Sequence, residues 1–261
     1  MSPERAIHAT AVVSAEATLA ADVHVGPFAV VGPRVILEEG CIVGAHTVLS
    51  GPARFGARCR IHSHASIGGD PQDLKFKGEE TKLEVGSDNT FREFVTINRG
   101  TAGGGGITRI GSHNFFMAYA HVAHDCLIGD YTIFANAATL AGHVTVEDHA
   151  TVGACSGVHQ FCRVGRHAFI GGYTVVTQDA LPFVKTVGNR AEAYGINTIG
   201  LERRGFAPET ILALKKAWRL LAQAGLNTSQ AVERIEAELS DVAECRYLAG
   251  FIRSSSRGIV K

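Results

Sequence analysis

The chain lacks the features that mark nucleic-acid-binding, membrane-spanning and disulfide-stabilised proteins. Its 25 Lys and Arg residues balance 25 Asp and Glu residues, and without a Lys/Arg-rich run no nucleic-acid partner is expected. It has no apolar run of about 18 residues and no signal-peptide pattern at the N-terminus. None of the six cysteines forms a C-x-x-C pair, which favours free buried thiols in a reducing compartment. We therefore expect a soluble, cytoplasmic protein with no membrane span.

A single tryptophan contrasts with 30 glycines, and the hydrophobic content of 46% is ample for a core. An aliphatic residue or Phe leads every six residues, without a break from Ile7 to Ile67 and again from Ile110 to Val176. The fifth residue of each six is small or slim. A period of six fits neither an amphipathic helix nor a simple strand. It predicts the hexapeptide repeat of a parallel β-helix, an all-β solenoid whose 18-residue coils stack about 4.8 Å apart.

Glycine often takes the second position of a six, where we expect a turn that requires a permissive backbone. Two stretches interrupt the repeat, near residues 69–83 and 98–109, and the second contains four consecutive glycines. Long insertions in compact domains are usually functional or disordered, so both are predicted to be projecting loops. No G-K-S/T follows the glycines, which argues against a phosphate-binding loop.

The repeat ends near Leu181-Pro182, and helical patterns begin at Pro208. We predict a β-helix domain over residues 1–188 and a C-terminal α-helical domain over residues 189–261. Apolar spacing indicates three short helices, the second capped by Asn227 or Thr228 and the third by Ser240. These helices would cover the open end of the solenoid, whose strand edges would otherwise invite aggregation. Residues 188–205 are expected to be irregular, and residues 253–261 a tail.

A cluster of histidines lies at positions that the repeat predicts to be outside the core. Residues 18 apart stack in columns, so His124, Gly142 and Gln160 form one column, with His143 and His159 in the columns beside it. These side chains are expected within two coil spacings, about 10 Å. A single surface histidine is often idle, but the clustering favours a working site.

Histidine suits proton transfer near neutral pH. Gly142 has no side chain to block its N–H, which could meet a developing oxyanion beside His124. Asp125 could orient a histidine, although as the neighbour of His124 in sequence it is expected to point awkwardly for that partner. A zinc site is the rival interpretation, with His121, His124 and His143 as ligands that a trimer interface could bring together.

A set of ordered motifs runs along essentially the whole chain. They are Val25-Gly26-Pro27-Phe28, Gln72-Asp73-Leu74-Lys75, Val95-Thr96-Ile97-Asn98-Arg99-Gly100-Thr101, Ala120-His121-Val122-Ala123-His124-Asp125-Cys126, Ala138-Thr139-Leu140-Ala141-Gly142-His143-Val144, Val158-His159-Gln160-Phe161-Cys162 and Gly200-Leu201-Glu202-Arg203-Arg204-Gly205-Phe206. By these motifs the chain resembles the UDP-N-acetylglucosamine 3-O-acyltransferase family, the first enzyme of lipid A biosynthesis. The hexapeptide repeat alone is weakly specific, whereas the ordered set is highly specific.

The resemblance implies a left-handed β-helix and a homotrimer with active sites in clefts between subunits. It implies a cofactor-free transfer of an (R)-3-hydroxyacyl chain from acyl carrier protein to the 3-hydroxyl of UDP-N-acetylglucosamine. His124 matches the general base, and the N–H of Gly142 matches the oxyanion donor. Positions that line the sugar and acyl-donor cleft match Gln72, Asp73, Lys75, His121, His143, His159 and Gln160.

The nucleotide-binding stretch of the family matches Asn197, Arg203 and Arg204, where guanidinium groups suit phosphate. Gly172 matches the position that limits acyl length, and a glycine leaves room for a longer chain. Two departures affect details: Ile199 replaces an acidic residue near the ribose, and Arg190 replaces a histidine beside the acyl groove. Other interpretations of the same residues are a hexapeptide acetyltransferase that uses acetyl-CoA, a zinc-dependent hydratase on this scaffold and a non-catalytic solenoid.

Overall fold

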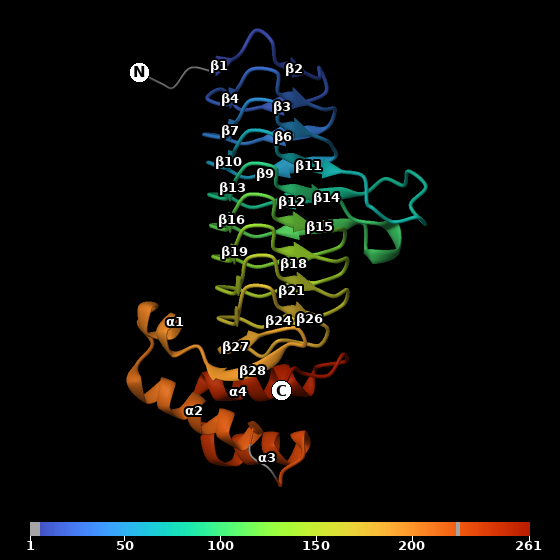
Figure 1. Ribbon diagram of the computed structural model, residues 1–261. Helices are drawn as coiled ribbons and strands as arrows, with labels where there is room; N and C mark the ends of the chain where they lie inside the picture. The colour runs from blue at the N-terminus through green and yellow to red at the C-terminus, as the bar shows by residue number, and fades with distance from the viewer. Residues whose placement is uncertain (1–5, 223–224) are drawn as a thin grey trace.

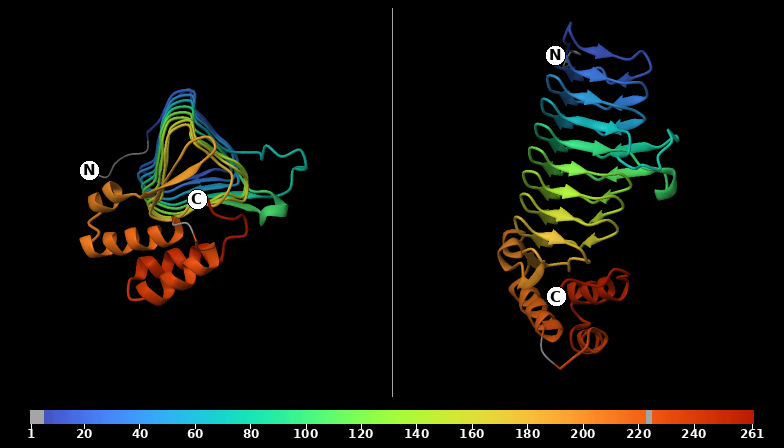
Figure 2. Two further views of the ribbon diagram at one scale, coloured as in Figure 1. Left: turned by 60° about the horizontal axis from the view of Figure 1, so that its bottom comes forward. Right: turned by 45° about the vertical axis from the view of Figure 1, so that its right-hand side comes forward.

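The computed structural model describes residues 6–222 and 225–261, in which stacked triangular coils stand on a cap of helices (Figures 1 and 2). Viewed along its axis, the solenoid has three flat faces, and each is a sheet of parallel strands (Figure 2). In one of these sheets the last strand, residues 192–196, pairs antiparallel with its neighbour. This is the left-handed parallel β-helix with a helical C-terminal region that was predicted.

The three faces take consecutive strands in turn, so each sheet contains every third strand along the solenoid. The first face contains, in order, β1 (Ala6–Ile7), β4 (His24–Val25), β7 (Ile42–Val43), β10 (Arg60–Ile61), β13 (Thr90–Phe91), β16 (Phe115–Phe116), β19 (Ile133–Phe134), β22 (Thr151–Val152), β25 (Phe169–Ile170), β27 (Val184–Val187) and β28 (Glu192–Ile196). The second contains β2 (Val12–Val13), β5 (Val30–Val31), β8 (Val48–Leu49), β11 (Ser66–Gly69), β14 (Thr96–Asn98), β17 (His121–Val122), β20 (Thr139–Leu140), β23 (Gly157–Val158) and β26 (Val175–Val176). The third contains β3 (Thr18–Leu19), β6 (Val35–Leu37), β9 (Ala53–Phe55), β12 (Lys82–Val85), β15 (Ile107–Ile110), β18 (Leu127–Ile128), β21 (Thr145–Val146) and β24 (Arg163–Val164).

The leading residues of the sixes form the core, as predicted. Val122 pairs with Leu140 and Leu140 with Val158, 18 residues apart each time, and all three side chains are buried. Burial of one such side chain contributes about 1.5–3 kcal/mol, and the loss of chain entropy offsets most of the sum. The expected free thiols are present, but Cys155 is exposed, whereas the other five cysteines are buried.

The glycines at the second position of a six serve close stacking of the coils, and not the turn that was expected there. Most have ordinary backbone angles, and only Gly68 has a positive φ, of 85°. A Cβ on Gly44 would lie 2.7 Å from the backbone nitrogen of Ser63 on the next coil, so glycine here permits close stacking. The left-handed turn residue is instead the fourth of most sixes, and many of these, such as His143 with a φ of 61°, are not glycine.

Both interruptions project from the corner between the second and third faces (Figure 1). The first lies between β11 and β12, and the second, with the short helix η1 (Ala102–Gly104), between β14 and β15. The sheet register continues across both, since Ile67 pairs with Ile97 and Ile97 pairs with Val122. Each insertion is therefore a loop added to an unbroken stack of coils.

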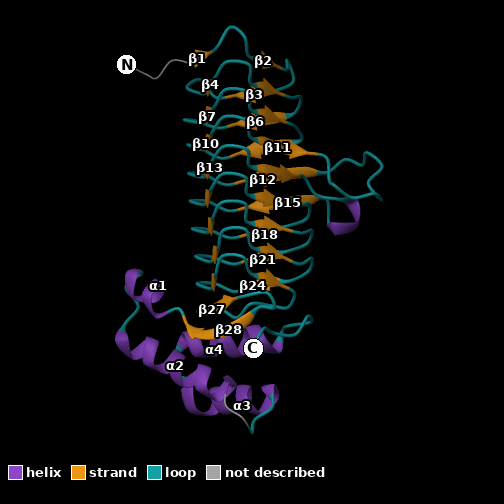
Figure 3. Ribbon diagram, in the orientation of Figure 1, coloured by secondary structure: helices purple, strands orange, loops and turns teal. Residues whose placement is uncertain are grey.

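Within the described residues four helices follow the coils, one more than predicted (Figure 3): α1 (Thr198–Arg203), α2 (Pro208–Ala222), α3 (Thr228–Leu239) and α4 (Ala243–Arg253). The stretch 188–205 was wrongly expected to be irregular, because β28 and a helix of six residues are too short to show a period. Asn227 caps α3, as predicted, through a capping box with Gln230. The cap predicted at Ser240 is wrong, since α4 begins two residues later, after Val242.

The helices cover the end of the solenoid, as predicted. Leu181, Phe183 and Val184 of the last coil share one buried cluster with apolar residues of α2, α3 and α4. The domain boundary between residues 188 and 189 stays a prediction. None of the helices in the described ranges is long and apolar enough to span a membrane.

Residues 254–261 are not the free tail that was expected. Val260 is buried, and its N–H donates to the carbonyl of Asp179 over 2.9 Å, while Asp179 N–H donates to Gly258 over 2.8 Å. The buried Asp179 carboxylate also accepts a hydrogen bond from the Ser255 hydroxyl. The segment runs upward from α4 toward the corner that bears the two loops (Figure 1).

Candidate active site

The histidines gather at the corner between the second and third faces, directly below the two loops. We call residues 123–126, 141–144 and 159–162 the site corner. The predicted column of His124, Gly142 and Gln160 is confirmed by the strand register, in which His121 pairs with Thr139 and Thr139 with Gly157. A Cβ on Gly142 would lie 2.6 Å from Cε1 of His124, so the imidazole packs against this glycine.

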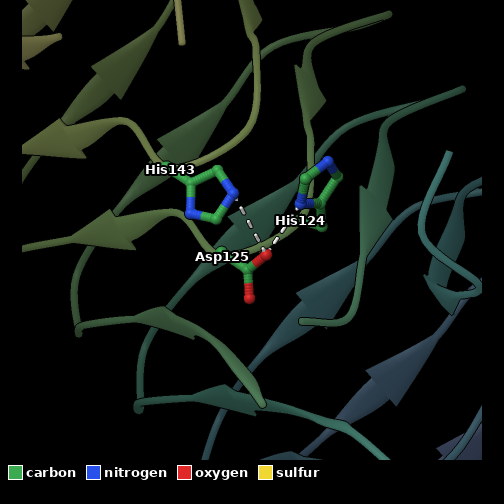
Figure 4. Close-up of side chains that lie close together, drawn as sticks. All are labelled: His124, Asp125 and His143. Carbon is green, nitrogen blue, oxygen red and sulfur yellow. Dashed lines mark hydrogen bonds and ion pairs between the residues drawn. The ribbon is translucent and has the colours of Figure 1, made fainter. Parts of the chain in front are cut away.

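His124 is paired with the residue that follows it (Figure 4). Its Nδ1 lies 2.7 Å from Oδ2 of Asp125, whose side chain is fully buried. The expectation that Asp125 would point awkwardly was wrong, because Asp125 adopts a φ of 60° at the turn, a backbone conformation that adjacency in sequence does not reveal. With Nδ1–H donating to the carboxylate, the proton-free nitrogen of His124 is Nε2, as a general base requires.

The second loop holds the Asp125 carboxylate in place. Thr101 donates to it twice, from its backbone N–H over 2.8 Å and from its hydroxyl over 2.7 Å. The N–H of Asp125 itself donates to the hydroxyl of Thr108. A Cβ on Gly104 would fall 2.0 Å from Cγ of Asp125, so one member of the glycine run is needed for close packing on this carboxylate.

His143 completes the group from the coil below. Its Nε2 lies 3.7 Å from Oδ2 of Asp125, and its ring meets that of His124 edge-on at 5.3 Å. On its other side it stacks on Phe161 at 4.5 Å. The His143 ring is therefore held in a fixed orientation beside the His124–Asp125 pair.

The Gly142 N–H donates no hydrogen bond to any residue that the structure describes. It lies next to the His124 imidazole and has no side chain to cover it. An unpaired amide beside an imidazole is chemically suited to donate a hydrogen bond to an oxyanion that forms there.

Of two further histidines, His159 belongs to the site corner and His121 lies next to it. His121 is half-buried, its Nδ1 lies 2.8 Å from the Thr96 hydroxyl, and burial lowers the pKa of its imidazole. His159 is exposed, and its Nδ1 lies 3.2 Å from both the carbonyl of Gln160 and a guanidinium nitrogen of Arg257. Gln160 is exposed beside it.

The predicted residues of the first loop lie above this corner without a described contact to the histidines. Asp73 accepts a hydrogen bond from the N–H of Lys75, which shapes the loop. The side chain of Leu74 is fully exposed. The prediction that Gln72, Asp73 and Lys75 line the substrate cleft therefore rests only on their position above the site corner.

The predicted nucleotide residues lie elsewhere, around α1. Asn197, Arg203 and Arg204 line a cavity of about 750 Å³ against the outer side of β19, β22 and β25. This is the first face, whereas His124 lies between the second and third. Asn197 accepts a hydrogen bond from Gly200 N–H as the cap of α1, and burial lowers the pKa of Arg204. One chain therefore does not bring these residues together with the histidines.

The two predicted acyl-length residues lie near the last coils. Gly172 follows β25, and a Cβ there would meet the Ala154 carbonyl oxygen at 3.3 Å. Arg190 lies in the exposed turn between β27 and β28. Neither has a described contact with His124, so their roles stay predictions.

The group of His124, Asp125 and His143 has the composition of a metal site, and it differs from the set of ligands that was expected. Donor atoms of His124, Asp125 and His143 all lie within 4.8 Å of one another. His121 is replaced by Asp125 in this set, because the His121 ring turns toward Thr96. Two imidazoles and a carboxylate can bind zinc, although His124 Nδ1 is already engaged by the carboxylate.

Sequence reasoning missed Thr101, Thr108 and Arg257. Thr101 ends one of the ordered motifs, so a signal existed, but the repeat could not show that its loop folds back onto Asp125. No pattern singles out Thr108 or Arg257, since both act through contacts with residues distant in sequence.

Family models match the two parts of the chain separately. The model described as bacterial transferase hexapeptide matches residues 16–51 and 107–142. The model described as UDP-N-acetylglucosamine O-acyltransferase, domain 2, matches residues 179–260. A curated relative from Anaeromyxobacter dehalogenans strain 2CP-1, named acyl-[acyl-carrier-protein]--UDP-N-acetylglucosamine O-acyltransferase, is 48% identical and covers 98% of this chain and 100% of its own. The chain belongs to the UDP-N-acetylglucosamine O-acyltransferase family.

Solved structures of the family agree with this fold along the whole chain. LpxA from Acinetobacter baumannii is 42% identical, with a TM-score of 0.95, and the match covers 98% of this chain and 99% of that one. UDP-N-acetylglucosamine O-acyltransferase from Moraxella catarrhalis is 37% identical, with a TM-score of 0.94 and coverage of 98% and 99%. Coils, loops and helical cap are therefore shared as one unit.

Proposed function

We propose that this chain transfers an (R)-3-hydroxyacyl group from acyl carrier protein to the 3-hydroxyl of UDP-N-acetylglucosamine, the first step of lipid A biosynthesis. The names of its full-length relatives supply the two substrates. The observation that supports the chemistry is the His124–Asp125 pair, with Nδ1 and Oδ2 2.7 Å apart, beside the unpaired N–H of Gly142.

The mechanism follows from this arrangement. Nε2 of His124 accepts the proton of the sugar hydroxyl while that oxygen attacks the thioester carbonyl carbon. The carbonyl oxygen becomes an oxyanion that accepts a hydrogen bond from Gly142 N–H. The tetrahedral intermediate then collapses, the carbon–sulfur bond breaks, and His124 returns the proton to the leaving thiolate. Buried Asp125 stabilises the imidazolium that exists between the two proton transfers.

The remaining site residues are proposed to bind the substrates. Loop residues Gln72, Asp73 and Lys75, together with His121, His143, His159 and Gln160, would line the sugar and acyl-donor cleft. Arg203 and Arg204 would contact the diphosphate, to which guanidinium groups are suited. Gly172 and Arg190 would limit the length of the acyl chain.

We also propose that the enzyme acts as a homotrimer with sites between subunits. This is supported by the separation, within one chain, of the cavity around α1 from the site corner. Mixed trimers of H124A and R204A subunits should recover activity, because some interfaces combine an intact corner with an intact cavity. If both halves of the site came from one chain, mixing would restore nothing. The cytoplasmic location stays a prediction.

The direct test uses purified protein, UDP-N-acetylglucosamine and a series of (R)-3-hydroxyacyl carrier-protein thioesters of increasing length. Mass spectrometry should detect a monoacylated sugar nucleotide, with one chain length preferred. Acetyl-CoA serves as the competing donor, and a product from it alone would instead support the acetyltransferase alternative.

The zinc-dependent hydratase remains a second candidate because His124, Asp125 and His143 can form a metal site. The metal content of the purified protein and activity after chelation distinguish the two. The acyltransferase proposal predicts full activity after chelation, whereas a hydratase would lose it.

A further inference from the structure

Arg257 is placed beside His159 by the anchored segment 254–261, about 100 residues later in the chain. Hydrogen bonds with Asp179 hold residues on both sides of Arg257. The Ser255 hydroxyl donates to the carboxylate of Asp179, and the backbone N–H of Asp179 donates to the carbonyl of Gly258. The Asp179 carboxylate also accepts the N–H of Arg163, which begins β24. The backbone on either side of Arg257 is thus held by the last coil, and its exposed side chain extends from this anchored segment to His159.

The guanidinium itself acts on two residues of the site corner. One of its nitrogens lies 3.2 Å from Nδ1 of His159. Its charge also acts on the buried thiol of Cys162, where burial raises the pKa and the nearby guanidinium opposes that rise. Both residues lie in the turn that carries Gln160, one coil below Gly142.

Nδ1 of His159 has two neighbours with opposite requirements. The carbonyl oxygen of Gln160, 3.2 Å away, can only accept, so it would require a proton on Nδ1. The guanidinium of Arg257, also at 3.2 Å, can only donate, so it requires a lone pair there. The neutral ring can satisfy one of them at a time, and its tautomer depends on which one prevails.

We propose that Arg257 is a positioning residue that fixes His159 as the tautomer with its proton on Nε2, so that this ring nitrogen donates a hydrogen bond to a substrate oxygen. Without Arg257, the proton moves to Nδ1, which then donates to the Gln160 carbonyl. Nε2 is left as an acceptor and can no longer donate a hydrogen bond to the substrate oxygen. The role in substrate binding rests on the proposed function, whereas the tautomer does not.

The tautomer is measured by nitrogen-15 NMR of histidine-labelled protein above pH 8, with the His159 signals assigned from H159Q. In the native protein Nε2 should carry the proton and Nδ1 should be proton-free. In R257A the proton should instead be on Nδ1. In R257K, which retains a charged donor, the native protonation should be restored. An unchanged pattern in R257A would overturn the proposal even if the enzyme transfers no acyl group, so this measurement stands apart from the proposed function.

Kinetics then test what the tautomer does. R257A should raise the KM of one substrate about tenfold, as expected when one hydrogen-bond donor is lost, with a smaller change in kcat. Gln at position 159 can present an amide N–H near the place of Nε2 without Arg257. Adding R257A to H159Q should therefore cost less than twofold.

The matched control is R253A, which removes an exposed guanidinium paired with Glu236 at the end of α4. It should leave KM, kcat and the tautomer unchanged, since surface ion pairs contribute little. An equal loss from R257A in the native and H159Q backgrounds would contradict the proposal and assign Arg257 a role that does not pass through His159.

Discussion

Two corners of the solenoid stack histidines in the same way, yet they have different chemistry. The site corner has His143 on Phe161 at 4.5 Å. At the corner between the third and first faces, which we call the ladder corner, His149 stacks on His167 at 4.6 Å. In both, the stacked residue is the fourth of its six and has a φ near 60°. Stacked rings at the turns are thus a property of the repeat.

The difference is a buried carboxylate. At the site corner Asp125 is fully buried and accepts from His124, whereas at the ladder corner Nδ1 of His167 is buried without a hydrogen-bond partner among the described residues. Burial, and then the nearby His149 and Arg204, lower the pKa of His167 to about 3. The buried Nδ1 of His167 thus has no carboxylate hydrogen-bonded to it among the described residues, whereas Asp125 holds and orients the imidazole of His124.

Among the changes that compare the two corners, D125N should give the largest effect, because it makes the site corner resemble the ladder corner. The amide has no charge to stabilise the His124 imidazolium, and its N–H can donate to Nδ1 and so reverse the tautomer. We expect kcat to fall by roughly 10²–10⁴-fold. Steady-state transfer assays, with circular dichroism to verify the fold, provide the measurement.

H113A is the matched control at the ladder corner. His113 stacks on Tyr131 at 4.6 Å and is exposed, and its removal should change kcat less than twofold. Comparable losses in H113A and D125N would erase the distinction between the two corners.

G104A should give an intermediate effect by moving the carboxylate without removing it. Its Cβ would lie 2.0 Å from Cγ of Asp125, so either the loop or the carboxylate must shift. Displacement of about 1 Å can reduce turnover by up to 10²-fold, and we expect a loss of about 10–10²-fold. Nothing lies within 4 Å of a Cβ on Gly103, so G103A should retain full activity. Equal activity of the two variants would show that the loop does not position Asp125.

H167F should give the smallest effect, and the property that it changes is the pH dependence of folding stability. The pKa of His167 in the folded protein lies below its ordinary value, so the unfolded chain binds the extra proton and stability falls as pH drops below about 6.5. Linkage gives a loss of about 2 kcal/mol by pH 5. Phe cannot titrate and stacks equally well, as Phe183 does one coil below. Urea unfolding at pH 7 and pH 5 should therefore show a weaker pH dependence in H167F, and an identical dependence in both proteins would contradict this assignment.

The repeat made most of the fold predictable, because each six repeats the same packing requirement. The 18-residue register alone places His124, Gly142 and Gln160 in one column. The turn dihedral of Asp125, the fold of the second loop onto its carboxylate through Thr101, and the return of residues 254–261 to His159 could not be predicted. Each depends on one contact between segments distant in sequence or on a single backbone angle, and neither leaves a periodic signal.

The most direct test of the account is the turnover of H124A with a hydroxyacyl carrier-protein thioester and UDP-N-acetylglucosamine, in protein shown to retain its fold and assembly state. The account predicts a fall in kcat of about 10³-fold or more, because both proton transfers pass through Nε2. Turnover within tenfold of the native enzyme would contradict it and move the catalytic base away from the His124–Asp125 pair.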